Sequence, residues 1–221
     1  MRIGVIGAGR IGGNTARLLA KADHEISLSF ARDRRGIDRL AAEIGARARV
    51  GSVAETVEFG EVVVLSVPWS ALPEALDQAG SLRGKIVIDT TNQFGSGPMP
   101  ADGQTAAQFN LQRMPGARYT KSFNTLTSDF QAEAAGRTGD ARVVQWICGD
   151  DADAKRVVGR LVDDAGFAPV DLGGTAECGV MEAPRRAGAV YGEEYRLADA
   201  RAVVDAVRSG RPIPPTPSYG S

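Results

Sequence analysis

The chain has 221 residues, of which 43% are hydrophobic and 24% are charged, as is typical of a soluble globular protein. This length suits one large domain with a small appendage and is too short for two full domains. A formal net charge of −1 gives no overall positive field, so the sequence does not indicate a nucleic-acid or membrane partner. No apolar run reaches the roughly 20 residues of a membrane-spanning helix, and the N-terminus lacks the pattern of a secretory signal.

The chain contains two cysteines, Cys148 and Cys178, and one histidine, His24. The cysteines form no CxxC pattern, which argues against a structural zinc site and for a reducing, cytoplasmic setting without disulfides. The cluster Asp150, Asp151 and Asp153 stands where a helix should begin, so we interpret these acids as stabilising the helix dipole rather than binding a metal. We therefore expect no metal site.

Short apolar runs alternate with helix-period segments over residues 1–175, which is the pattern of βαβ units and a parallel sheet. Strands are predicted over residues 2–6, 25–30, 47–50, 62–67, 85–89, 118–123, 143–148 and 168–172. Helices are predicted over residues 11–22, 37–44, 53–58, 72–79, 105–113, 153–165 and 197–207. A Gly/Pro-rich loop over residues 93–103 is long for such a fold, and loops of this length are usually functional.

A GxGxxG motif runs from Gly7 through Gly9, Arg10 and Ile11 to Gly12, directly after the first predicted strand. The first glycine permits a tight turn, the second lets a pyrophosphate approach the backbone, and the third lets the helix pack on the strand. The amides at the helix N-terminus then face the phosphates. We therefore predict a dinucleotide site here. The alternative is a purely structural turn.

The end of the second predicted strand decides which dinucleotide binds. An NAD site usually carries an acidic residue about 20 residues beyond the glycines, but no carboxylate stands at this position. Ser29 stands there instead, followed by Arg32, Arg34 and Arg35 with Asp33 between them, and hydroxyl and guanidinium groups suit a 2′-phosphate. NADP(H) is therefore favoured over NAD(H), with Arg32 as the preferred ligand. Alternatively, Arg34 and Arg35 are solvated charges at the start of a helix.

Ligands of open α/β sheets bind beyond the carboxyl ends of the strands, so the residues that follow the strands should converge on the nicotinamide. These residues are Ser66, Val67, Pro68, Trp69, Asn92 and Asn124. For Trp69, as for Phe123, packing at the edge of the hydrophobic core is an equally weighted alternative to lining the nicotinamide site. His24 lies at the opposite edge of the sheet, so no histidine-based catalytic group can be assembled here, and we assign no catalytic residue.

Seven segments stand in the same order in a known family: residues 2–13 (RIGVIGAGRIGG), 23–25 (DHE), 66–69 (SVPW), 89–92 (DTTN), 121–125 (KSFNT), 148–151 (CGDD) and 169–173 (PVDLG). Over residues 1–175 the chain resembles the NADPH-dependent reductases of the deazaflavin coenzyme F420, the F420H2:NADP oxidoreductases. A membrane-fused branch that reduces metals shares this domain. The resemblance implies a Rossmann-like, doubly wound, mainly parallel α/β sheet.

The resemblance also implies roles for the residues singled out above. The glycine loop with Arg10 and Ile11 would bind pyrophosphate, Ser29 and Arg32 the 2′-phosphate, and Ser66–Trp69 with Asn92 and Asn124 the nicotinamide side. The implied reaction is hydride transfer between NADPH and coenzyme F420, which requires positioning more than acid–base chemistry. A homodimer is expected from the family alone.

The C-terminal part departs from the family. We divide the chain into an NADP-binding domain (1–175), a small extension (176–211) that forms an acceptor pocket or a dimer contact, and a flexible tail (212–221). Residues 177–195 differ from the family's helical end, so the acceptor stays open. Arg185 and Arg186 either contact an anionic acceptor or are solvated.

Two rival functions remain. One is the reduction of a small carbonyl or imine by NADPH, with Tyr191 or Tyr195 as proton donor. The other is a non-catalytic NADP(H)-binding regulatory module. Loss of turnover on replacing either tyrosine by phenylalanine would favour the first, and tight nucleotide binding without NADPH oxidation would favour the second.

Overall fold

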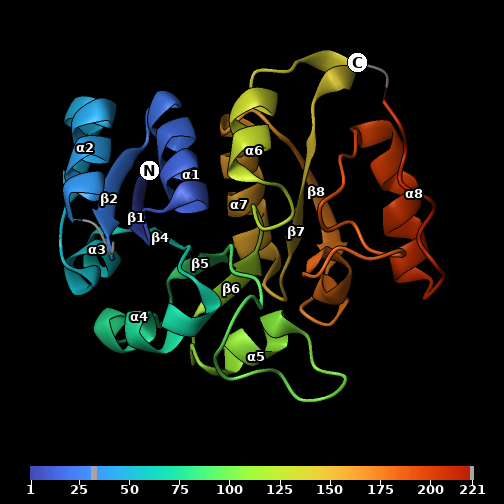
Figure 1. Cartoon of the computed structure of the whole chain (residues 1–221), viewed down its shortest axis with the longest axis horizontal. Helices are drawn as coiled ribbons and strands as arrows, with labels where there is room; N and C mark the ends of the chain where they lie inside the picture. The colour runs from blue at the N-terminus through green and yellow to red at the C-terminus, as the bar shows by residue number, and fades with distance from the viewer. Residues whose placement is uncertain (31–33, 220–221) are drawn as a thin grey trace.

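The computed structural model describes residues 1–30 and 34–219, with the backbone alone at Arg34. Within these residues eight strands form one sheet in the order β3-β2-β1-β4-β5-β6-β7-β8 (Figure 1). The strands are β1 (Arg2–Ile6), β2 (Glu25–Ser29), β3 (Ala48–Val50), β4 (Val62–Leu65), β5 (Ile86–Asp89), β6 (Arg118–Lys121), β7 (Val144–Cys148) and β8 (Ala168–Gly173). The first six follow the strand order of a dinucleotide-binding fold.

All neighbouring strands are parallel except β6 and β7, which are antiparallel. Among the described residues, β6 and β7 are paired at one position, Lys121 opposite Cys148. This junction, which we call the β6–β7 seam, divides the sheet into β1–β6 and the pair β7–β8. The prediction of a Rossmann-like, doubly wound, mainly parallel α/β sheet is confirmed.

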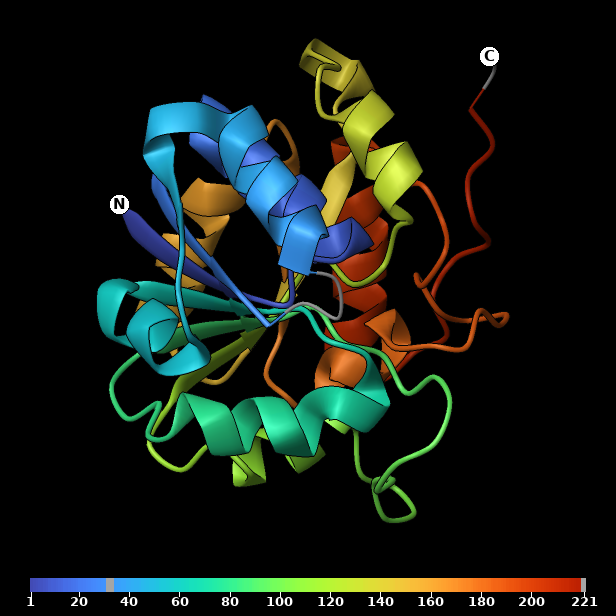
Figure 2. The same ribbon diagram turned by 60° about the vertical axis from the view of Figure 1, so that its left-hand side comes forward.

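Helices cover both faces of the sheet, as Figures 1 and 2 show. The α-helices are α1 (Arg10–Lys21), α2 (Arg34–Ile44), α3 (Val53–Phe59), α4 (Leu72–Ala79), α5 (Ala106–Gln112), α6 (Ser128–Ala134), α7 (Ala152–Asp164) and α8 (Leu197–Arg208). Alternate strand residues point to opposite faces, so Ile3 and Val5 pack with α1, α2, α6 and α7, whereas Ile6 packs with α3, α4, α5 and α8. Two buried hydrophobic layers therefore hold the sheet between them.

The helix α6 is absent from the sequence prediction. It has seven residues, about two turns, which is too short to show a clear apolar period. Its start does carry a recognisable residue, because the Thr127 hydroxyl accepts a hydrogen bond from the Phe130 amide. The predicted 62–67 and 118–123 strands end earlier in the structure, at Leu65 and Lys121.

The C-terminal segment packs into the same core as the sheet. Cys178, Met181, Val190, Tyr195 and Val203 belong to the hydrophobic layer that also contains β4 and β7 residues. Residues 177–181 form a short 3₁₀ helix, and the remainder up to α8 is irregular. The division into a domain, an extension and a tail stays a prediction.

Residues 211–219 contain no helix or strand. At their end the Tyr219 hydroxyl accepts a hydrogen bond from the Arg196 amide (2.8 Å) and donates one to Asp199 (2.7 Å). Tyr219 therefore contacts the start of α8. Among the described residues, no helix is both long and apolar enough to cross a bilayer.

Candidate functional site

Three adjoining pockets lie along the edge of the sheet where β1, β2, β4, β5 and β6 end. The β2-side pocket has a volume of about 550 Å³ and is lined by Ser29, Phe30 and Val50 among others. The glycine-loop pocket, of about 530 Å³, contains Gly7 and Gly9 and shares Phe30, Ile37 and Ala71 with the first. The β6-side pocket, of about 680 Å³, shares Gly9, Arg10, Ser66, Val67 and Pro68 with the second. Together they form one continuous cleft.

The glycine motif forms the floor of this cleft. Gly7 has a φ of 100°, and a Cβ there would lie 2.2 Å from the Ser66 carbonyl oxygen. A Cβ on Gly12 would lie 2.1 Å from the Gly7 carbonyl oxygen. Both positions therefore exclude larger residues for reasons internal to the fold. A Cβ on Gly9 would meet no atom within 4 Å, and Gly9 lines the glycine-loop pocket, so the space beside it opens into the cleft.

The N-terminus of α1 faces the same space. Its first turn has no side-chain cap and no acidic residue, whereas α3, α5 and α7 are capped by the side chains of Ser52, Thr105 and Asp151. The uncapped amides of a helix N-terminus attract anions. Together with the open space at Gly9, the start of α1 fits the pyrophosphate of a dinucleotide.

The residues expected to hold a 2′-phosphate are described only in part. Ser29 lines the β2-side pocket, but its side chain is buried and its hydroxyl donates to the Val5 carbonyl over 3.4 Å. Arg32 lies outside the described residues, and Arg34 is described only as the first backbone position of α2. Their roles stay predictions.

The turn after β4 forms the wall shared by two of the pockets. Ser66 accepts a hydrogen bond from the Thr90 hydroxyl (2.9 Å), which ties the end of β4 to the end of β5. Trp69 lines the β6-side pocket but is only 1% exposed: its indole donates to the Pro98 carbonyl (2.8 Å) and stacks on Phe109. Trp69 therefore fixes the 93–103 loop. Phe123 is fully buried against Phe167, as the packing alternative predicted.

The structure brings the two predicted asparagines together in the β6-side pocket. The Asn92 amide donates to the Asn124 carbonyl (2.9 Å), and the Asn124 amide donates to Asn92 Oδ1 (3.2 Å) and to the Met181 carbonyl (2.6 Å). Asn92 Oδ1 also accepts from the Ala183 amide (3.3 Å). The pair therefore fastens the irregular C-terminal segment to the end of the sheet.

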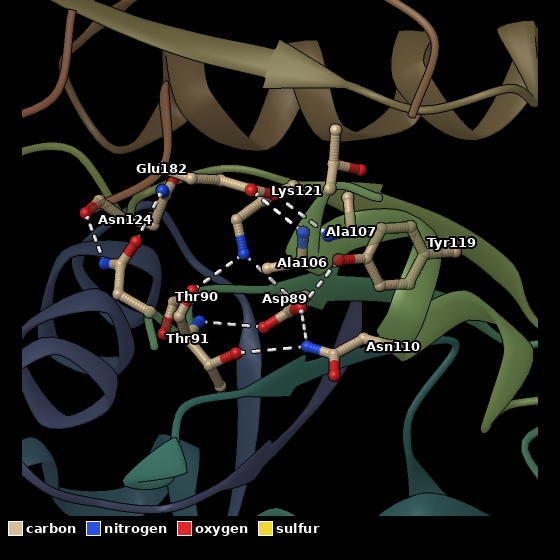
Figure 3. A network of polar contacts seen from close by, with 12 residues as sticks. Asp89, Thr90, Thr91, Ala106, Ala107, Asn110, Tyr119, Lys121, Asn124 and Glu182 are labelled. Carbon is tan, nitrogen blue, oxygen red and sulfur yellow. Dashed lines mark hydrogen bonds and ion pairs between the residues drawn. The ribbon is translucent and has the colours of Figure 1, made fainter. Parts of the chain in front are cut away.

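A buried polar network behind these asparagines was not predicted (Figure 3). Asp89 accepts hydrogen bonds from the Tyr119 hydroxyl (2.6 Å), the Asn110 amide (2.8 Å) and the Thr91 backbone (2.7 Å), and it lies 3.5 Å from Lys121 Nζ. Lys121 in turn donates to the Thr91 carbonyl (2.7 Å). Both charged residues end strands of the sheet, and the register that pairs them is visible in the structure but not in the sequence.

Protonation in this network follows from burial and charge together. Burial opposes ionisation of Asp89, but the Lys121 charge and the three hydrogen bonds outweigh it, so the pKa of Asp89 is lowered. Burial, reinforced by the Asp89 charge, raises the pKa of Tyr119 well above its usual range. Tyr119 therefore stays a hydrogen-bond donor to an ionised Asp89.

Glu182 anchors the C-terminal segment to α5, as Figure 3 shows. Its carboxylate is 4% exposed and accepts hydrogen bonds from the Ala106 and Ala107 amides, both of 2.9 Å. A carboxylate at a helix N-terminus is favourable for the dipole and satisfies otherwise unpaired amides. The sequence analysis did not single out Glu182, because the backbone amides that it contacts lie about 75 residues away in the chain.

The C-terminal segment forms the outer wall of the β6-side pocket. Tyr191 packs against Phe94 with ring centroids 6.2 Å apart, and Arg185 lines the pocket while paired with Glu193. Arg186 instead donates to the carbonyls of Gly179, Glu182 and Pro184. Tyr195 lies in the core against Trp146. Of the two tyrosines and two arginines considered from the sequence, Tyr191 and Arg185 therefore line this pocket.

The other polar residues considered from the sequence do not line the three pockets of the cleft. His24 is buried at the opposite edge, where it contacts the N-terminal amine (3.1 Å) and Asp164 (3.0 Å). Asp151 caps α7, as the interpretation of the acidic cluster predicted, and Asp150 accepts from Thr175. The described residues contain no group of three or more acidic, histidine or cysteine side chains placed to hold a metal.

The strand order, the glycine loop and the cleft at the carboxyl edge are those of a Rossmann-type fold, in which a dinucleotide typically binds at this edge. Residues 2–93 match the model of the family described as NADP oxidoreductase, coenzyme F420-dependent. The matched segment is less than half of the chain, and over it the chain is similar to that family of NADP-dependent oxidoreductases.

Similar proteins match more of the chain. A hypothetical protein from Sinorhizobium meliloti has 26% identity and a TM-score of 0.77, over 89% of this chain and 95% of its own. A candidate F420-dependent NADP-reductase from Arthrobacter sp. FB24 has 25% identity and a TM-score of 0.69, over 81% and 87%. The metalloreductase STEAP3 of Rattus norvegicus is 26% identical over 182 residues, 82% of this chain. The chain spans only 36% of the length of that relative.

Proposed function

We propose that this protein transfers hydride between NADPH and the deazaflavin coenzyme F420. The observation that carries the proposal is the continuity of the glycine-loop and β6-side pockets, which share five residues. A nicotinamide nucleotide bound along the glycine loop would direct its ring toward Ser66, Val67 and Pro68. A second flat ring would then occupy the β6-side pocket, next to the aromatic pair Phe94 and Tyr191.

The residues of this chain act by binding and orientation. The amides at the start of α1 and the space at Gly9 hold the pyrophosphate, and Ser29, Arg32 and Arg34 hold the 2′-phosphate. Ser66, Val67, Pro68, Trp69, Asn92 and Asn124 shape the nicotinamide end. NADPH supplies the hydride, so the protein needs to fix two rings in contact and to exclude water.

The charged residues that line the β6-side pocket, where the acceptor would bind, are compatible with this reaction. Arg10 and Arg185 are its charged residues in the described part of the chain, and neither a carboxylate nor a histidine lines it. No acidic side chain among the described lining residues would therefore repel an anionic ring system there. Exchange of hydride between two cofactors needs no strong acid or base from the protein.

The direct test mixes the purified protein with NADPH and oxidised coenzyme F420 and follows the loss of the deazaflavin's visible absorbance. We expect a loss that depends on enzyme concentration, and a much slower one with a flavin as acceptor. NADPH binding without any loss of absorbance would contradict the proposal and favour the non-catalytic module.

A second candidate is the reduction of a small carbonyl or imine, favoured by the position of Tyr191. Tyr191 lines the β6-side pocket, and partial burial raises the pKa of its phenol, so it stays protonated at neutral pH. This reaction requires the phenol as a proton donor, so Tyr191→Phe should abolish it while deazaflavin exchange continues. The buried Tyr195 provides the matched control, since Tyr195→Phe removes a hydroxyl outside the pocket.

The cellular location and the oligomeric state are inferred from the family resemblance alone. We infer a cytoplasmic homodimer on that basis. Size-exclusion chromatography with light scattering tests the dimer.

A further inference from the structure

Thr90 directly follows β5 and lines the β6-side pocket, but the function proposed above gives it no role. It is 6% exposed, and its backbone amide donates to the Leu65 carbonyl (3.0 Å) at the end of β4. Its hydroxyl donates to Ser66 Oγ over 2.9 Å. Ser66 lines both the glycine-loop pocket and the β6-side pocket. Thr90 is therefore bonded to a residue at the junction of the two pockets.

The direction of this hydrogen bond decides what the Ser66 hydroxyl can do. A serine hydroxyl has one hydrogen to donate and two lone pairs that accept. Since Ser66 Oγ accepts the hydrogen of Thr90, its own hydrogen stays available to a different acceptor. Among the described residues no acceptor takes this hydrogen, and Ser66 is partly exposed. A ligand in the cleft can therefore accept it.

The Ser66 hydroxyl stands between the start of α1 and the end of β5. Its oxygen lies 3.1 Å from the position that a Cβ would take on Gly12. Gly9 and Arg10, at the same start of α1, also line both pockets. A dinucleotide that runs along the glycine loop would have its nicotinamide at this junction. The nicotinamide carries a carboxamide, and an amide oxygen accepts hydrogen bonds.

The backbone next to Thr90 is held by the buried ion pair, as Figure 3 shows. Asp89 accepts from the Thr91 amide (2.7 Å), and Lys121 donates to the Thr91 carbonyl (2.7 Å). Both polar backbone groups of Thr91 are thus occupied, so the end of β5 is fixed before a ligand arrives. Binding to a donor that is already in place loses less conformational entropy.

We infer that Ser66 donates a hydrogen bond to the carboxamide oxygen of the nicotinamide, and that Thr90 is the positioning residue that directs this bond. The inference rests on the proposed NADP(H) function and deepens it, because it assigns a donor and an acceptor atom. A hydroxyl that accepts a hydrogen bond is itself a stronger donor. Thr90 therefore both orients the Ser66 hydroxyl and strengthens its bond to the ligand.

The test measures dissociation constants of NADP⁺ and of thio-NADP⁺, in which sulfur, a weak acceptor, replaces the carboxamide oxygen. Calorimetry gives both constants in the absence of a second substrate. For Ser66→Ala we expect NADP⁺ to bind about fivefold more weakly, the effect of one neutral hydrogen bond, and thio-NADP⁺ to change by less than about twofold. An equal weakening of both nucleotides overturns the bond to the carboxamide.

The positioning role of Thr90 is tested by two substitutions at that residue. For Thr90→Val we expect NADP⁺ to bind about threefold more weakly, with thio-NADP⁺ changed by less than about twofold. Thr90→Ser keeps the hydroxyl and should bind both nucleotides as the wild type does. Because Thr90 acts through Ser66, the double variant Ser66→Ala/Thr90→Val should bind NADP⁺ as weakly as Ser66→Ala alone. Effects that multiply in the double variant overturn the positioning role.

A matched control separates this role from a purely structural one. Thr56 Oγ1 forms a similar hydroxyl pair with Ser27 Oγ (3.1 Å), and neither residue lines the three pockets of the cleft. Thr56→Val should therefore change neither constant. Lower thermal stability of Thr90→Val with an unchanged ratio of the two constants would show a structural role and overturn the inference. Both constants are measured without deazaflavin, so a wild type that fails to reduce coenzyme F420 contradicts the proposed reaction alone.

Discussion

Asp89 and Lys121 face each other at the ends of β5 and β6, with 3.5 Å between Oδ2 and Nζ and no exposed surface on either side chain. This ion pair lies directly behind Thr90, Thr91 and Asn92, which line the β6-side pocket. A buried charge is tolerated only where it is paired and hydrogen-bonded. The pair therefore fixes the backbone at the end of β5, where the two rings would meet.

Replacing Lys121 by methionine should strongly destabilise the protein. The change leaves Asp89 charged and buried without its counter-ion, which typically costs about 3–5 kcal/mol. Urea unfolding at pH 7 measures the loss. Lys155→Met is the matched control, because Lys155 pairs with the half-exposed Asp171, and it should cost less than about 1 kcal/mol. Equal losses in the two variants would contradict the role given to the buried pair.

Replacing Glu182 by glutamine should weaken binding of the acceptor in the β6-side pocket more than binding of NADPH along the glycine-loop pocket. The change weakens the bonds to the Ala106 and Ala107 amides and loosens the segment that carries Arg185 and Tyr191. We expect the KM for the acceptor to rise several-fold, while the KM for NADPH stays unchanged. Steady-state kinetics with each substrate varied in turn measures both. The control is Glu133→Gln, which removes a surface partner of Arg137; a parallel rise in both KM values would refute the separation of the two ends.

Alanine at Gly9 and at Gly12 should have different effects. At Gly9 the added methyl meets no protein atom, so stability should change by less than about 1 kcal/mol while NADPH binding weakens at least tenfold. At Gly12 the methyl would collide with the Gly7 carbonyl, so the fold itself should be destabilised. Thermal unfolding without ligand, together with NADPH titration, distinguishes the two. Normal nucleotide binding by Gly9→Ala would exclude a pyrophosphate at this position.

The ion pair of Arg118 and Asp151 should make stability pH-dependent in acid. A two-pronged hydrogen bond from Arg118 (2.6 and 3.0 Å), with the Ala154 amide, holds the pKa of Asp151 well below its usual range. A depressed carboxyl pKa contributes stability above the unfolded-state pKa of about 3.9, and this contribution is lost as the pH falls through the folded-state pKa.

The variant Arg118→Met should therefore be less stable than wild type at pH 7, by about 1 kcal/mol or less because the pair is partly exposed. The difference should shrink as the pH falls below about 4. Urea unfolding at pH 7 and pH 3 checks this. A difference that is constant with pH would show that the loss comes from packing of the Arg118 side chain and not from charge.

Much of the fold was predictable because its signals are local. The strands β1, β4 and β5 are short apolar runs, and the glycine motif predicts a nucleotide loop because it directly follows β1 and opens α1. The helix α4 was predicted to the residue, since its apolar positions recur at helical spacing and Gly80 follows it.

The unpredicted parts depend on contacts between distant residues. The pairing of Asp89 with Lys121 requires the register of two strands, and the Glu182 cap requires the path of an irregular segment around α5. Cys178 and Met181 are core residues on a 3₁₀ helix that is too short to show a clear period, and Val190 is a core residue of the irregular segment that follows. Arg32, the preferred ligand for the 2′-phosphate, lies outside the described residues, so its role stays a prediction from the sequence.

The β6–β7 seam has a consequence for how the cleft is built. Backbone pairing joins the two halves of the sheet at one described position, so their relative placement depends on packing in the two hydrophobic layers, which contain residues of both halves. Asn124 and Glu182 fasten the C-terminal segment to the first half. The glycine loop and the uncapped start of α1 belong entirely to the half before the seam. Substitutions in the C-terminal segment can thus reshape the β6-side pocket while the glycine loop and the start of α1 keep their shape.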